Sequence, residues 1–165
     1  MHTPTERHDI TTETGKPRSR QSRSVSFAIE ALSSRSRPSV VLATVVASVA
    51  HIPVTGPHLD EAPYMGVLFI VLTAACAALA LAALVRDSKA VYLMVIVTCG
   101  LAVIGYAATR LFPFPMLSDD VGNWLEPLGV VSIISESIAV AAAVAALAGS
   151  RRTVRSAVGR PEMAA

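Results

Sequence analysis

The fold is decided by residues 63–111, which read PYMGVLFIVLTAACAALALAALV, then RDSK at 86–89, then AVYLMVIVTCGLAVIGYAATRL. Each apolar run is long enough to cross a bilayer as a helix, which takes about 20 residues. The four polar residues between the runs leave room only for a short reversal of the chain. This stretch therefore predicts two antiparallel transmembrane helices.

Two further apolar runs lie outside this pair, before and after it in the sequence. The chain of 165 residues is 53% apolar and 16% charged, whereas soluble domains carry roughly 25% charged residues. We expect an all-α fold, a four-transmembrane-helix bundle over residues 38–150 with disordered, basic cytoplasmic tails at 1–37 and 151–165. The predicted spans are about 39–55, 63–85, 90–111 and 124–149.

Positive charge is distributed unequally between the two sides of the predicted bundle. All of the 14 lysines and arginines except Arg110 lie in the two tails or in the 86–89 link. This is the positive-inside pattern, and it predicts that both termini are cytoplasmic. Basic segments beside a membrane bind anionic inner-leaflet lipid at about 1 kcal/mol per residue. That partner accounts for the arginines, so we expect no binding of nucleic acid.

Two ionisable residues lie well inside the predicted spans, His51 in the first and Glu136 in the last. Such residues are costly in hydrocarbon and are candidates for function. By helix rise, both lie about 18–20 Å above the inner face. The first and last helices of a four-helix bundle are usually neighbours, so we expect the two side chains to meet. They would either fix helix packing by a buried hydrogen bond or hold a proton, metal or ligand.

A second group of candidate ligands surrounds the outer end of the first hairpin. His51, His58 and Glu61 follow the pattern HxxxxxxHxxE, and imidazole and carboxylate are ligands of zinc, copper and non-haem iron. The cofactor that this pattern suggests is a divalent metal ion. The alternative is a solvated turn at His58 and a first-turn acid at Glu61 that favours the helix dipole.

Arg110 is the one cation on the outer side, one helical turn after Tyr106. Its simplest role is to extend to the membrane surface. The alternative is an ion pair with Glu126 or Asp119. For Asp119 and Asp120 themselves, we expect capping and solvation near the start of the last helix.

The two cysteines, Cys76 and Cys99, lie inside the second and third spans at similar depths. They could be neighbours at a contact between helices. The sequence holds no CxxC pair that would indicate a redox motif.

Several of these motifs together resemble a family of small bacterial four-span integral membrane proteins, common in actinobacteria, which has no assigned activity. The resemblance is carried by residues 51–69, 106–113 and 126–129 and by the single acid in the last helix. The segment 114–120 departs from the family's glycine-rich outer loop. The resemblance implies the four-span topology, a bacterial plasma membrane and one functional set, which comprises His51, His58, Glu61, Glu126 and Glu136.

Three functions remain open at this point. The first is a non-enzymatic membrane protein with a polar pocket on the extracytoplasmic half of the bundle, binding a metal ion or small ligand. Its binding residues would be His51, His58, Glu61 and Glu136, supported by Tyr106, Arg110 and Glu126. The second is a redox enzyme subunit with the histidines as haem or metal ligands. The third is a structural accessory, as a homo-oligomer or within a larger membrane complex.

Overall fold

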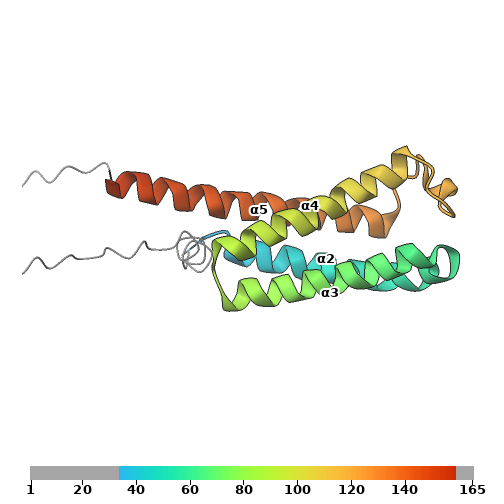
Figure 1. Cartoon of the computed structure of the whole chain (residues 1–165), viewed down its shortest axis with the longest axis horizontal. Coiled ribbons are helices and arrows are strands. Elements are labelled where there is room, and N and C mark those ends of the chain that lie inside the picture. Colours follow the sequence, from blue (N-terminus) through green and yellow to red (C-terminus); the bar gives the residue numbers. More distant parts are fainter. Residues whose placement is uncertain (1–33, 159–165) are drawn as a thin grey trace, which may run out of the picture.

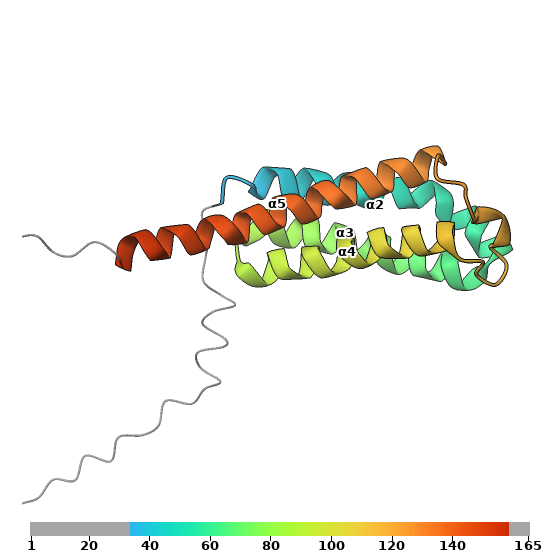
Figure 2. The same ribbon diagram turned by 90° about the horizontal axis from the view of Figure 1, so that it is seen from above.

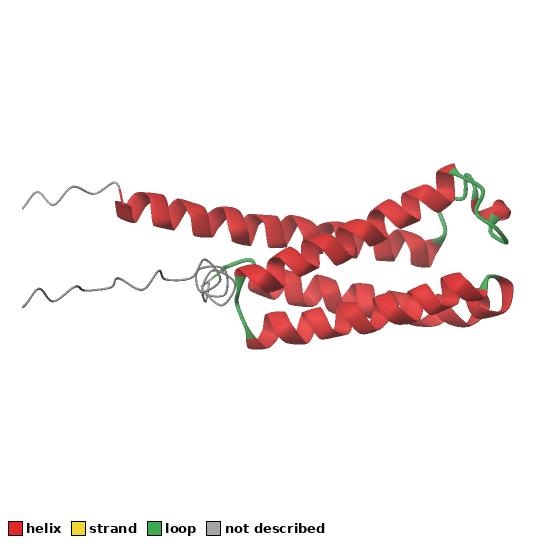
Figure 3. Cartoon of the chain, viewed as in Figure 1, coloured by secondary structure: helices red, strands yellow, loops and turns green. Residues whose placement is uncertain are grey.

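The computed structural model describes residues 34–158, with side chains described as far as Ser150. The long helices are α2 (Arg37–Glu61), α3 (Pro63–Val85), α4 (Lys89–Leu111) and α5 (Pro127–Val158), and a short 3-10 helix, η1 (Ser118–Asp120), precedes α5. The part of the chain that is described contains no strand (Figure 3). All four long helices are long and apolar enough to cross a membrane, α5 over Pro127–Ser150. The predicted all-α four-helix bundle is confirmed.

Side chains are distributed as lipid-facing helices require. Large apolar side chains such as Leu42 and Leu81 are exposed around the bundle. The interior is built mostly of small residues, including Ala47, Ala83 and Ala143. Small residues let membrane helices approach closely, because packing, rather than exclusion from water, holds them together there.

The helices form two layers that are joined through α2 and α5 (Figures 1 and 2). Helix α2 packs against both α3 and α5, and α4 packs against α5. The first and last spans are therefore neighbours, as predicted. The contact between α3 and α4 is the least extensive of the four, and Figure 1 shows α4 diverging from α3 along the bundle.

Polar contacts tie α2, α3 and α4 together at the end of the bundle that holds residues 86–88, here called the link end. Arg37 donates from Nε to the Ala83 carbonyl at 2.8 Å and from Nη2 to the Leu84 carbonyl. Asp87 accepts from the Ser34 amide at 2.7 Å and from the Tyr92 hydroxyl at 2.5 Å. Three helix ends are thus fixed here, so α3 and α4 can separate only toward the opposite end, here called the loop end.

Helix α2 extends further than predicted. The sequence placed its end near residue 55 and a loop at 56–62, but the helix continues through Pro53 and Pro57 to Glu61. A helix in a membrane tolerates proline where side chains, neighbouring helices or local changes in the helix satisfy the backbone groups that proline frees. Side chains bond to carbonyls in this region, as Thr55 does to the His51 carbonyl at 2.8 Å. Only Ala62 separates α2 from α3.

Helix α5 begins later and ends later than predicted. Residues 124–126 are not helical, and Pro127 is the first helical residue. Proline suits that position because its missing N–H has no partner to lose there. Beyond Ser150 the helix continues to Val158, into the segment predicted as a tail. The remaining tail predictions, for residues 1–33 and 159–165, lie outside the described residues.

Candidate ligand cavity

A cavity of about 480 Å³ occupies the loop-end half of the bundle. All four long helices and the 112–126 loop line it. Its walls are mainly aliphatic and aromatic side chains of α3 and α4. Its polar side chains come from α2, α4, the loop and α5, and they are His51, His58, Thr98, Tyr106, Thr109, Arg110, Asp120, Glu126, Ser132 and Glu136.

The cavity opens sideways between α3 and α4. Leu68 and Val71 of α3 line it and are also 59% and 61% exposed on the outside of the bundle. Leu101 of α4 lines the opposite side and is 63% exposed. In a membrane these side chains face lipid, so the mouth of the cavity is open to the bilayer.

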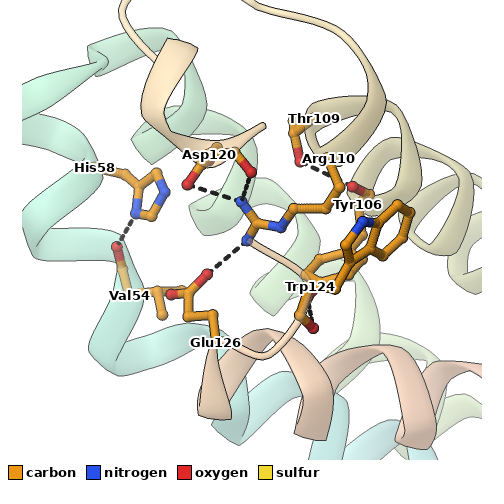
Figure 4. Close-up of polar contacts among 8 residues, drawn as sticks. All are labelled: Val54, His58, Tyr106, Thr109, Arg110, Asp120, Trp124 and Glu126. Carbon is orange, nitrogen blue, oxygen red and sulfur yellow. Dashed lines mark hydrogen bonds and ion pairs between the residues drawn. The ribbon is translucent and has the colours of Figure 1, made fainter. Parts of the chain in front are cut away.

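Arg110 organises the polar end of the cavity (Figure 4). Its side chain is buried, and Nη1 lies 2.7 Å from Asp120 Oδ1 while Nη2 lies 2.6 Å from Glu126 Oε2. The guanidinium also packs on the Tyr106 ring, 4.6 Å from its centroid. The predicted pair with Glu126 is confirmed. The predicted pair with Asp119 is not formed, because η1 turns Asp120 toward the guanidinium. The prediction that Arg110 extends to the membrane surface is wrong, because its side chain is buried.

The 112–126 loop is held over the cavity by hydrogen bonds to helix residues. Tyr64 of α3 donates to the Pro115 carbonyl at 2.6 Å, and Tyr106 of α4 donates to the Trp124 carbonyl at 3.0 Å. The Gly122 amide donates to the Arg110 carbonyl at 3.0 Å. Gly122 has a φ of +81°, a conformation that glycine adopts without strain. The loop thereby closes the cavity at its polar end.

His51 and Glu136 meet in the bundle interior, as their matched depths predicted. His51 Nε2 lies 3.5 Å from Glu136 Oε1, and both side chains are almost fully buried. His51 Nδ1 bonds to the Ala47 carbonyl at 2.6 Å. A carbonyl only accepts, so Nδ1 carries the hydrogen and a neutral His51 presents a lone pair to the carboxyl. The pair therefore needs one proton between its two facing atoms.

His58 lines the cavity near its polar end. Its Nδ1 bonds to the Val54 carbonyl at 2.8 Å, which leaves Nε2 as its other polar atom (Figure 4). Phe69 of α3 contacts both histidines, with ring centroids 5.6 Å from His51 and 4.8 Å from His58. One phenyl ring therefore packs against both imidazoles and fixes their positions on this side of α2.

The proposed metal ligands are not brought together as a set. Among residues 34–158, no three His, Cys, Asp or Glu side chains lie close enough to hold a metal ion. His51 and Glu136 form a pair, and His58 lies further along α2. Glu61 is exposed at the end of α2 and does not line the cavity. The described residues therefore do not support the HxxxxxxHxxE pattern as a metal site.

Cys76 and Cys99 are neighbours, as their positions allowed. Both are buried and unpaired as disulfides, and their side chains interact with each other. They belong to the main core cluster. This arrangement agrees with two small residues at a contact between α3 and α4.

The structure adds two residues that the sequence did not indicate as part of the site. Asp120 is the second partner of Arg110, and Phe69 is the ring that packs on both histidines. The glycine two residues after Asp120 predicts a turn that could return this acid toward the helix. Nothing in the local sequence distinguishes Phe69 from the other large apolar residues of α3.

Comparison with known protein families, curated proteins and solved structures found no match for this chain.

Proposed function

We propose that this chain is a multi-pass protein of a bacterial plasma membrane that binds a small amphiphilic molecule in the loop-end cavity. The observation that supports this proposal most directly is a cavity with apolar walls, a charged end and a mouth that faces lipid. Its volume lies in the range of ligand pockets, roughly 300–1,000 Å³. An amphiphile could enter from the bilayer and place its polar head near Arg110 and its tail between α3 and α4.

The cavity favours an organic ligand over a bare metal ion. Most of its lining is apolar, and the described residues offer no three-ligand group for a metal. The polar side chains lie at the end and along one side of the cavity, as expected where a few polar groups orient an apolar ligand. The role would be binding, in sensing or handling the ligand or in helping a partner protein.

The orientation of the bundle is part of the same proposal. The division of Lys and Arg supports cytoplasmic termini, which would place the loop end and the cavity on the extracytoplasmic half. The basic segments would bind anionic lipid of the inner leaflet. The resemblance to bacterial four-span proteins is the basis for assigning the plasma membrane.

Photo-crosslinking tests the binding proposal. The purified protein in lipid nanodiscs is irradiated with decanol that carries a diazirine in its tail, and the labelled peptides are identified by mass spectrometry. We expect labelling of cavity-lining residues that excess unlabelled decanol suppresses. Ala75→Phe, in the cavity wall, should abolish that labelling by filling the space.

Ala78→Phe is the matched control, since Ala78 is exposed on the same helix and does not line the cavity. It should leave labelling unchanged. Labelling that is spread over the lipid-facing surface and is insensitive to competitor would contradict the proposal. That result would favour the competing role, a structural accessory within a homo-oligomer or a larger complex.

A further inference from the structure

The charges that line the cavity are unbalanced. Arg110 is the only Lys or Arg among the lining residues, and the acids are Asp120, Glu126 and Glu136. Arg110 already pairs with Asp120 and Glu126 at 2.7 and 2.6 Å. This cluster of three therefore has one negative charge more than it has positive charge, before Glu136 is considered.

Glu136 adds a buried acceptor whose bonding is incomplete. The residue is 2% exposed, and among the described residues its Oε1 has no hydrogen-bond partner. His51 Nε2, at 3.5 Å, is near it without making a hydrogen bond. A buried polar atom without a partner is costly. A donor on a bound molecule would supply the missing bond.

Aromatic rings complete this environment. Phe69, Tyr106 and Phe114 line the cavity, and Tyr106 already carries the Arg110 guanidinium over its face. The faces of aromatic rings attract cations. The rings and the acids therefore favour the same kind of ligand head group.

We propose that the ligand of this cavity is an amphiphilic cation, an amine or ammonium head on an apolar tail. This inference rests on the proposed function and names its ligand class. The head would lie between Glu126 and Glu136, and donate to the free carboxyl oxygen of Glu136. Arg110 Nε also lacks a partner among the described residues and would suit an acceptor, but the two carboxylates around the same guanidinium would repel an anion.

Competition with a head-group series tests the ligand class. Decylamine, decanol and decanoate have tails of the same length. Each is added as a competitor of the diazirine probe, with the wild-type protein in zwitterionic nanodiscs. Each is compared at equal mole fraction in the lipid, so that partitioning does not set the order. We expect the ammonium compound to compete at least about tenfold better than the alcohol, because an opposite charge nearby is favourable in a medium of low dielectric constant. Decanoate should compete worst.

Two variants test whether Glu136 is responsible for the preference for the amine over the alcohol. Glu136→Gln keeps the size of the side chain and should narrow the amine-to-alcohol ratio to within about threefold, since an amide cannot ionise to pair with the ammonium head. Asp60→Asn changes an exposed acid at the same end of the bundle that does not line the cavity, and should leave the ratio unchanged.

The outcomes separate the two proposals. Equal competition by all three compounds, or better competition by decanoate, overturns the cation while the binding function stands. A preference for the amine that Glu136→Gln leaves intact, or that Asp60→Asn removes, also overturns the inference. Failure of every compound to displace the probe overturns the binding function and the ligand class together.

Discussion

His51 and Glu136 are buried side by side at a depth where an isolated charge is costly. His51 Nδ1 donates to the Ala47 carbonyl, so Nε2 is the ring nitrogen that faces the carboxyl. A neutral imidazole then faces a protonated carboxyl, and a protonated imidazole faces a carboxylate. Whether the proton sits on the acid or on the imidazole, each group compensates the other. Removing one leaves its partner in apolar surroundings.

We therefore predict that His51→Ala and Glu136→Gln each destabilise the bundle, by about 1–3 kcal/mol, because one member of a buried pair of facing polar side chains is replaced. The double variant should cost less than the sum of the two, with a coupling of about 0.5–3 kcal/mol. Unfolding by SDS titration in mixed micelles, followed by circular dichroism, measures each value.

The matched control combines Glu136→Gln with His58→Ala. His58 lies about two turns further along α2 and bonds to the Val54 carbonyl, so this pair should be additive. If the losses in free energy of unfolding caused by His51→Ala and Glu136→Gln also add, the two side chains are not energetically coupled, although they lie 3.5 Å apart. Glu136 would then act as a lone packing residue.

The sequence predicted the His51–Glu136 contact because the rise of a helix converts residue number directly into depth. It named Asp119, and not Asp120, as the acid of the loop that could pair with Arg110, whereas the pair forms with Asp120. That choice depends on the direction of η1, a single turn whose geometry is set by the loop around it. Helical positions are therefore predictable here from sequence, and loop positions are not.

The α2–α3 hairpin is the tightest connection between elements in the described chain. Ala62 is fully buried, and its amide bonds to the His58 carbonyl at 2.9 Å. A Cβ at Gly66 would lie 2.5 Å from Leu59 Cγ and 2.7 Å from the Leu59 backbone nitrogen. Glycine is required at position 66 because a backbone atom of the neighbouring helix end occupies that space.

Gly66→Ala should therefore destabilise the hairpin, by about 1–3 kcal/mol as expected for overpacking. Gly100→Ala is the control, since nothing lies within 4 Å of its added Cβ. That change should be neutral or stabilising by up to about 1 kcal/mol, the difference in helix propensity. Both are measured by the same SDS titration. Equal effects of the two substitutions would show that the close approach at Leu59 relaxes without cost.

The ends of the helices show where the hydropathy pattern predicts structure correctly. The predicted spans at 63–85 and 90–111 agree with α3 and α4 to within one residue, because a charged link separates them. The predicted end of the first span was wrong because proline was read as a helix stop. In a membrane, the demand for internal hydrogen bonds outweighs that local signal.

At the scale of the whole molecule, the cavity follows from fixing one end of the bundle. Arg37 and Asp87 hold three helices together at the link end, and at the loop end Tyr64 and Arg110 bond to the connecting loop. Helices α3 and α4 diverge from the link end toward the loop end (Figure 1), where the loop bridges the space between them. The rise per residue gives positions along the helices but no distances between helices. The sequence therefore indicated polar residues on the outer half of the bundle without predicting the cavity that they line.

The orientation of the whole molecule is tested by cysteine labelling. On the proposed topology, a cysteine at the exposed Ser118 of η1 should react with an impermeant thiol reagent added to intact cells. One at Ser156, near the end of α5, should react only after the membrane is opened, because Lys and Arg near the spans favour the cytoplasmic side. Both variants are made with Cys76 and Cys99 replaced by Ala. Labelling of Ser156→Cys alone in intact cells would reverse the orientation and place the cavity on the cytoplasmic half.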